Sequence, residues 1–126
     1  MIFKVPDKLE SNRLIIRPFG MEDLDGFYSF MSSKKATRYL LFSDEQKTFE
    51  STKQLLEQTI NNYGTEEQIY ALAVENKRDG KFVGSIGLGP DFNGSDYQIF
   101  WSILPEYWNN GFATEATKLF IEYAFS

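Results

Sequence analysis

Apolar residues recur along the chain at two spacings, and each spacing predicts a different element. Short apolar runs bounded by turn residues predict strands, and apolar positions three and four residues apart predict one-sided helices. Their order is a strand, two helices, three closely spaced strands and a last helix, which predicts a single α+β (mixed α/β) domain over residues 1–126. The predicted strands cover residues 13–18, 68–75, 81–88 and 96–104, and the predicted helices cover about 24–31, 47–63 and 112–124.

Each predicted helix carries its apolar residues on one face, as a helix packed on a sheet does. Gly64 is expected to end the second helix. The short apolar patch Tyr39–Phe42 lies between the first two helices. The positions expected to face inward are Leu24, Phe27, Tyr28 and Met31 in the first helix, Phe49, Leu56, Ile60 and Tyr63 in the second, and Phe112, Ala113, Ala116, Leu119, Phe120, Tyr123 and Ala124 in the third.

The three closely spaced strands predict an antiparallel meander. Residues 68–75 are apolar on both faces, which is typical of a central strand. The segment 76–80 ends in Asp-Gly and predicts a tight hairpin with a positive φ, whereas 90–95 predicts a looser turn. Gly84 and Gly87 within the middle strand indicate a close backbone approach or a bulge.

The amino-acid composition excludes several kinds of catalytic and metal site and disfavours some partners. The chain is 42% hydrophobic with 12 Phe, 7 Tyr and 2 Trp, and its net charge of −5 disfavours nucleic-acid binding. It has no Cys and no His, which excludes a disulfide, a Cys- or His-ligated metal and a Ser-His-Asp triad. The longest apolar run, residues 69–74, is far shorter than the roughly 20 residues of a membrane span. With no signal peptide at the N-terminus, we expect a cytoplasmic protein without metal, nucleic-acid or membrane partners.

The segment 103–116 is the candidate for chemistry, because a strand ends, a Gly-containing turn follows and a helix begins. The amides and dipole of such a helix start favour a phosphate or pyrophosphate. Gly111 and Ala113 keep the approach uncrowded, and Thr114 adds a hydroxyl. A glycine before an amphipathic helix is more often only a turn, and no Lys follows it as a P-loop requires. Glu115 fits a first-turn charge better than a catalytic base.

Three segments, however, resemble one family. Trp108–Ala116 looks like the acyl-CoA pyrophosphate loop of the GNAT acetyltransferases. Ser11–Pro18, with Asp23 after it, and Phe82–Leu88 are similar to the opening phrase and third strand of the RimJ/RimL-like branch. The resemblance implies a GNAT-like fold and an N-acetyltransferase that moves an acetyl group from acetyl-CoA to a primary amine without a metal.

The resemblance also implies where the cofactor lies. The pantetheine arm would pair with the strand end at Ile103-Leu104-Pro105, and amides of the loop would hold the pyrophosphate. Trp108 stands at the loop position where the family usually has Gln or Arg. The expected cofactor-binding residues are Ile103, Leu104, Trp108, Asn109, Asn110, Gly111, Phe112, Ala113 and Thr114.

The catalytic groups stay unassigned at this stage. A backbone N–H near Ile103 is the natural donor to the developing oxyanion. Strand alternation places Tyr97 on the same face as Ile103, where a packed aromatic is about twice as common as a proton-handling group. Glu75 and Asp96 are candidate bases, although each fits a solvated strand-end charge better.

Members of the family continue beyond this helix with a further strand, a helix and a hairpin, whereas this sequence stops at Phe125-Ser126. We therefore expect a truncated product, an excised fragment or half of an assembly. The strand at 96–104 would then be an open edge, paired with another copy in a homo-oligomer or covered by the N-terminal segment. The alternative to an enzyme is a non-catalytic GNAT-like module that binds CoA or a protein. The acceptor stays open among protein N-termini, polyamines, aminoglycosides and small amines, with acidity weakly favouring a cation.

Overall fold

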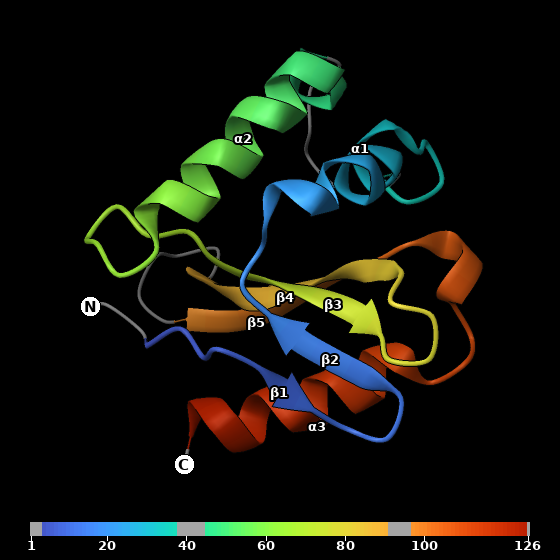
Figure 1. The fold of residues 1–126 in the computed structure, drawn as a ribbon. Helices are drawn as coiled ribbons and strands as arrows, with labels where there is room; N and C mark the ends of the chain where they lie inside the picture. Colours follow the sequence, from blue (N-terminus) through green and yellow to red (C-terminus); the bar gives the residue numbers. More distant parts are fainter. Residues whose placement is uncertain (1–3, 38–44, 91–96, 126) are drawn as a thin grey trace.

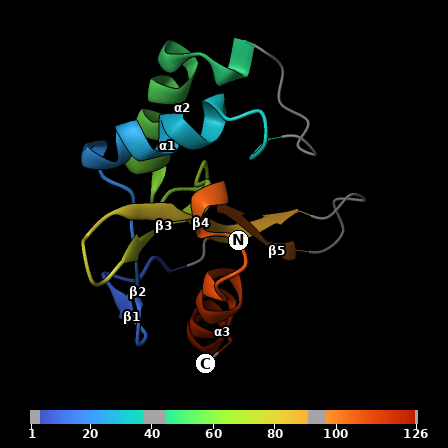
Figure 2. The same ribbon diagram turned by 90° about the vertical axis from the view of Figure 1, so that its right-hand side faces the viewer.

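One antiparallel sheet organises the chain, with helices on both of its faces. The computed structural model describes residues 4–37, 45–90 and 97–125. In that part five strands lie in the order β1-β2-β3-β4-β5, so neighbours in sequence are neighbours in the sheet. Figures 1 and 2 show α1 and α2 on one face and α3 on the other. The elements are β1 (Leu9–Glu10), β2 (Leu14–Arg17), α1 (Leu24–Ser32), α2 (Phe49–Asn62), β3 (Tyr70–Asn76), β4 (Phe82–Pro90), β5 (Tyr97–Ile103) and α3 (Phe112–Ala124).

The predicted mixed α/β fold and its element order are confirmed. β1 is the strand that the sequence pattern missed, because two residues are too short to show an alternation. It pairs with β2 through Leu9 and Ile16. Thr48 is the N-cap of α2, because its hydroxyl accepts a hydrogen bond from the Ser51 amide at 3.2 Å.

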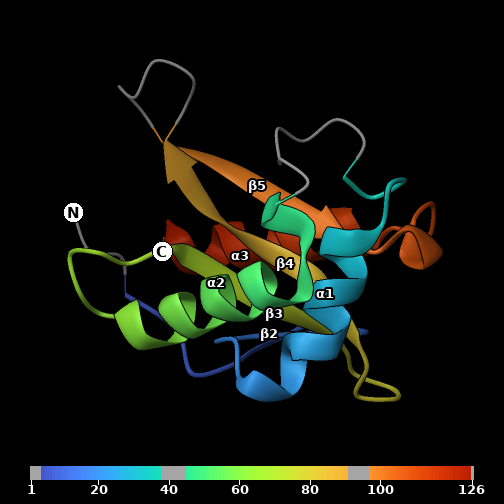
Figure 3. The ribbon, with the colours of Figure 1, turned by 90° about the horizontal axis from the view of Figure 1, so that it is seen from above.

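Strand alternation sends residues into two separate cores. In β2, Leu14 and Ile16 are fully buried against α3, whereas Arg17 points toward α1 and α2. Figure 3 shows α1 and α2 lying across β3 and β4, with α3 on the far side. The buried core beneath α3 consists of Leu14, Ile16, Tyr70, Leu72, Val74, Val83, Ile86, Leu88, Ile103, Phe112, Ala116 and Phe120.

Helix α2 corrects one prediction. Leu56 is fully buried as expected, but Phe49 is 42% exposed. Phe49 is the first residue of the helix, and its ring meets the edge of the Tyr28 ring at 5.3 Å instead of reaching the sheet. Tyr63 anchors the other end, because its hydroxyl accepts from the Phe19 amide at 3.1 Å and donates to the Ala71 carbonyl. The patch predicted at 39–42 and the loose turn at 91–95 lie outside the described residues.

The close approach predicted in β4 is confirmed. The register of β3 and β4 shifts between Val74 and Glu75, opposite Gly84. A Cβ added at Gly84 would collide with the Ser102 carbonyl oxygen of β5, so only glycine fits. The hairpin prediction is also confirmed, since Gly80 has φ +72°.

The two edges of the sheet differ. In the part of the chain that the structure describes, β5 pairs with β4 on one side and with no strand on the other. Leu9 and Glu10 of β1 form the opposite edge, and the Lys4 carbonyl accepts hydrogen bonds from Tyr70 of the central strand and Tyr123 of α3. The expectation that the N-terminal segment covers β5 is therefore wrong for β1, which pairs with β2. None of the described helices is long and apolar enough to cross a membrane.

Candidate active site

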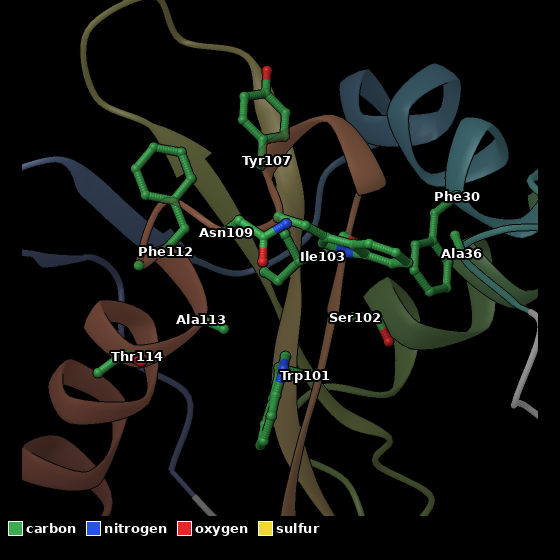
Figure 4. Close-up of a pocket in the computed structure, with 12 residues that line it drawn as sticks. Phe30, Ala36, Trp101, Ser102, Ile103, Tyr107, Asn109, Phe112, Ala113 and Thr114 are labelled. Atoms are coloured by element: carbon green, nitrogen blue, oxygen red, sulfur yellow. The ribbon is translucent and has the colours of Figure 1, made fainter.

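A cleft of about 490 Å³ opens along the unpaired edge of β5. Figure 4 shows the start of α3 on one side of it, Phe30 and Ala36 on the other, and the end of β5 between them. Trp101 and Ser102 point to opposite sides of the strand. Besides these, the cleft is lined by Ile103, Tyr107, Trp108, Asn109, Gly111, Phe112, Ala113 and Thr114. The structure therefore gathers seven of the nine expected cofactor residues, all but Leu104 and Asn110, around one space.

The loop before α3 turns its backbone amides toward solvent. Gly111 has φ +82° and Asn109 has φ +66°, left-handed values that Gly and Asn tolerate best. The Asn110 side chain accepts a hydrogen bond from the Phe112 amide at 3.2 Å, so that amide is not available to a ligand. The amides of Gly111, Ala113 and Thr114 have no protein partner within the described residues. Unpaired amides at a helix start have the geometry and partial charge that suit an anion.

Hydrogen bonds from Ser11 and Arg13, near the N-terminus, hold this loop and the first turn of α3. Arg13 donates from Nε to Glu115 at 2.7 Å and from a terminal nitrogen to the Asn110 carbonyl at 2.9 Å. Its guanidinium also lies 4.6 Å from the centre of the Phe112 ring. The Ser11 hydroxyl and the Arg13 amide donate to the second Glu115 oxygen. Sequence reasoning missed this role, although Ser11 and Arg13 stood in a segment that resembled the family.

Glu115 is a structural charge, as its position in the first turn predicted. Burial by itself would raise the pKa of Glu115, but the hydrogen bonds from Ser11 and Arg13 outweigh burial and lower it. A carboxylate ionised so readily is a poor base at neutral pH.

The end of β5 offers one residue's backbone to a ligand. The Leu104 amide donates to Val83 at 2.9 Å, and the Leu104 carbonyl accepts from Tyr107 at 2.9 Å, which leaves Leu104 no backbone group for the cofactor. Because alternate residues of an antiparallel strand face opposite neighbours, the N–H and C=O of Ile103 point to the open edge. The Trp108 indole donates to the Ile103 carbonyl at 2.8 Å. Trp108 therefore occupies part of the edge where the cofactor arm was expected.

Glu75, the candidate base that the structure describes, does not lie at the cleft. Glu75 accepts a hydrogen bond from Arg17 at 2.9 Å, and it does not line the cleft. Arg17 also makes two bonds, of 2.8 and 2.9 Å, to the buried Asp23, whose carboxylate accepts from the Gly20 amide as well. This network holds α1 on the sheet. Asp96 and the side chain of Tyr97 lie outside the described residues. Among described residues, no cluster of three His, Cys, Asp or Glu side chains could hold a metal ion.

Comparison with known proteins agrees with this geometry. The family model described as an acetyltransferase (GNAT) domain matches residues 13–126. The chain is 26% identical over 121 residues to the uncharacterized N-acetyltransferase YoaA of Bacillus subtilis, covering 94% of this chain and 66% of the relative. It is 26% identical to YnaD of the same organism, an uncharacterized N-acetyltransferase, covering 93% of this chain and 65% of the relative. The chain thus spans slightly less than two thirds of these relatives.

Solved structures show the same fold. A GNAT-family acetyltransferase from Bacillus anthracis superposes with a TM-score of 0.74 at 24% identity, covering 94% of this chain and 66% of that one. The ribosomal-protein-S5-alanine acetyltransferase of Vibrio fischeri gives a TM-score of 0.65 at 19% identity, covering 94% and 67%. Together with the family match over residues 13–126, these likenesses show that the chain belongs to the GNAT acetyltransferase family.

Proposed function

We propose that the chain forms the acetyl-CoA-binding part of an N-acetyltransferase that acts on a primary amine. The observation that carries the proposal is the meeting of two features in one cleft. The amides at the start of α3 form an anion site, and the backbone of Ile103 faces the same space. A pyrophosphate and an extended amide-bearing arm need these two features side by side.

In this proposal the amides of Gly111, Ala113 and Thr114 hold the pyrophosphate, and their partial positive charge takes the place of a metal. The Ile103 N–H donates to the thioester carbonyl oxygen as negative charge develops there. The amine nitrogen attacks the carbonyl carbon, the carbon–sulfur bond breaks, and the thiolate takes a proton as CoA leaves. The amine proton passes to solvent. Positioning supplies most of the acceleration, since a thioester is already activated.

The finer assignment follows from the resemblance of residues 11–18 and 82–88 to the RimJ/RimL-like branch. The open edge of β5, which carries the 54%-exposed Trp101, supports pairing with a second copy of the chain. A second candidate function is a CoA-binding module without turnover. The Trp108–Ile103 hydrogen bond favours it, because that contact stands where an extended arm would pair.

Acetyl-CoA binding tests the proposal, measured by thermal shift and calorimetry. At 100 times the dissociation constant, binding adds about 2.7 kcal/mol of stability, which is readily detected in a small domain. Gly111→Val is expected to abolish the shift. Gly64→Val is the matched control, because Gly64 has φ +80° with no atom near its absent Cβ, while Gly111 has φ +82°.

Two outcomes separate the candidates. Binding together with acetylation of any amine supports the enzyme, whereas binding without turnover supports the module. An absence of binding at millimolar acetyl-CoA, or equal binding by the two valine variants, contradicts both.

A further inference from the structure

A second cavity, of about 200 Å³, lies between the sheet and the two helices α1 and α2. The rings of Phe19, Phe27, Phe30 and Phe100 line it, and the polar atoms that reach it are hydroxyls. None of the described residues that line it carries a charge. An apolar cavity of about 150 Å³ is enough for benzene. The space therefore fits an aryl or branched alkyl group.

This cavity adjoins the acetyl-CoA cleft. Phe30 and Ser102 line both spaces. Ser102 directly precedes Ile103, whose N–H faces the open edge of β5. A group seated in the cavity would therefore lie one residue along the strand from the position proposed for the thioester.

Two hydroxyls mark the floor of the cavity. Ser85 of β4 and Ser102 of β5 are cross-strand partners, and the side chains of both line the space. Ser85 is only 7% exposed. Neither hydroxyl makes a hydrogen bond to another described residue. Hydroxyls accept hydrogen bonds from an amine without carrying a charge.

We propose that this cavity receives the apolar group of the acceptor, and that the hydroxyls of Ser85 and Ser102 orient its amine toward the thioester. The inference rests on the proposed acetyltransferase function and names its substrate class: a neutral amine beside an aryl or branched alkyl group. An ammonium buried without a carboxylate partner is strongly disfavoured. Amines of low basicity, such as α-amines, lose their proton near neutral pH far more readily than lysine-type amines do. Polyamines and aminoglycosides, which carry several charges, are disfavoured.

Three acceptor amines test the proposed substrate class. Phenylalanine amide and glycine amide carry the same kind of α-amine and differ only in the benzyl group, while spermidine carries several charges. We expect kcat/KM for phenylalanine amide to exceed that for glycine amide by at least about tenfold, since a single methylene is already worth about 10-fold or more in an apolar pocket. Spermidine should be the poorest. The peptide Phe-Gly-Gly distinguishes the two sources of such an amine. Acetylation of the peptide indicates that the acceptor is a protein or peptide N-terminus, and acetylation of the amide alone indicates a small molecule.

Two isoleucines of nearly equal exposure provide matched variants. Ile69 lines the cavity and is 38% exposed, whereas Ile121 lies on α3 on the other face of the sheet and is 40% exposed. Ile69→Asp should bring kcat/KM for phenylalanine amide down toward that for glycine amide, and Ile121→Asp should leave the ratio of the two unchanged. Ala71→Leu fills the cavity without adding charge and should have the same effect as Ile69→Asp. Ser102→Ala should raise KM for phenylalanine amide, and Ser102→Thr should restore it.

The inference and the function beneath it fail in different ways. Loss of acetyl-CoA binding in the parent chain overturns the proposed function. If acetyl-CoA binds and transfer occurs, the inference is overturned by equal rates with phenylalanine amide and glycine amide, or by a preference for spermidine. An equal response of the Ile69 and Ile121 variants overturns it as well.

Discussion

The Nε of Arg13 donates to the carboxylate of Glu115 at 2.7 Å, joining residues 102 positions apart in the sequence. The same guanidinium holds the Asn110 carbonyl and lies over the Phe112 ring. Arg13 thus contacts the loop before α3 once, at Asn110, and the first turn of α3 twice, at Phe112 and Glu115, without lining the main cleft. Its role is to hold the loop in shape.

Arg13→Met tests this role. The variant removes the hydrogen bonds to the loop and keeps much of the apolar stem, so the loop becomes less ordered. We expect acetyl-CoA to bind about fivefold more weakly, which corresponds to about 1 kcal/mol, the usual worth of one such hydrogen bond. Calorimetric titration measures the change. Arg78→Met, at an exposed hairpin arginine, is the control, and equal weakening by both variants would assign the effect to net charge alone.

Low pH should weaken the hydrogen bonds of Ser11 and Arg13 to Glu115, because they depend on an ionised carboxylate. The pKa of Glu115 is lowered in the folded chain, so the carboxylate stabilises the fold above its unfolded pKa, and this contribution is lost as pH falls through the folded value. Parent and Glu115→Gln are therefore expected to differ in unfolding free energy at pH 6 and to converge only as pH falls through the lowered pKa of Glu115. Urea unfolding at several pH values measures this. A difference that stays constant across the range would contradict the assignment.

The buried pair of Arg17 and Asp23 should be far more important to stability than the surface pairs. Asp23 is 3% exposed and takes two hydrogen bonds from Arg17, so Asp23→Ala leaves two guanidinium donors without their acceptor and Arg17 paired through Nε with Glu75 alone among the described carboxylates. We expect a loss of about 3–5 kcal/mol in unfolding free energy. Glu10→Ala, which breaks exposed pairs with Lys8 and Lys77, should change the unfolding free energy far less, because exposed ion pairs are screened by solvent. Comparable losses from the two variants would show that Asp23 does not anchor α1.

Binding of acetyl-CoA is expected to compete with the hydrogen bond between Trp108 and Ile103. Its indole donates to the Ile103 carbonyl, and an arm pairing along β5 has to compete for that acceptor. Trp108→Phe removes the donor, so acetyl-CoA is expected to bind up to about fivefold more tightly, again the worth of one hydrogen bond. Binding of acetyl-CoA should also shift the fluorescence of Trp108. The variant Trp101→Phe removes the other tryptophan of the chain, so its fluorescence reports Trp108 alone. Weaker binding by Trp108→Phe would show instead that the indole contacts the cofactor.

Local patterns of the sequence predicted most of the fold. The apolar stripe of α3, the hairpin at Gly80 and the crowded position of Gly84 each depend on neighbours within one element or one turn. The turn before α3 belongs to the same class, since a glycine of φ +82° at the start of an amphipathic helix is a local feature.

What the sequence did not reveal depends on contacts between distant segments. The contact of Arg13 with Asn110, the capture of Glu75 by Arg17 and the exposure of Phe49 all follow from how elements are placed. The hydrogen bonds of the Leu104 amide to Val83 and of its carbonyl to Tyr107 belong to the same class of contact. Strand alternation alone does not show which backbone groups a neighbouring turn consumes.

The separation between Arg13 and Glu115 has a consequence for folding kinetics. Contacts this far apart in sequence close slowly, because a long loop must be ordered before they form. The loop before α3 then takes its final shape only after β2 and α3 have met across the sheet. During refolding, capacity to bind the nucleotide should emerge in the last phase, behind the helical signal, so cofactor binding reports completion of the whole domain.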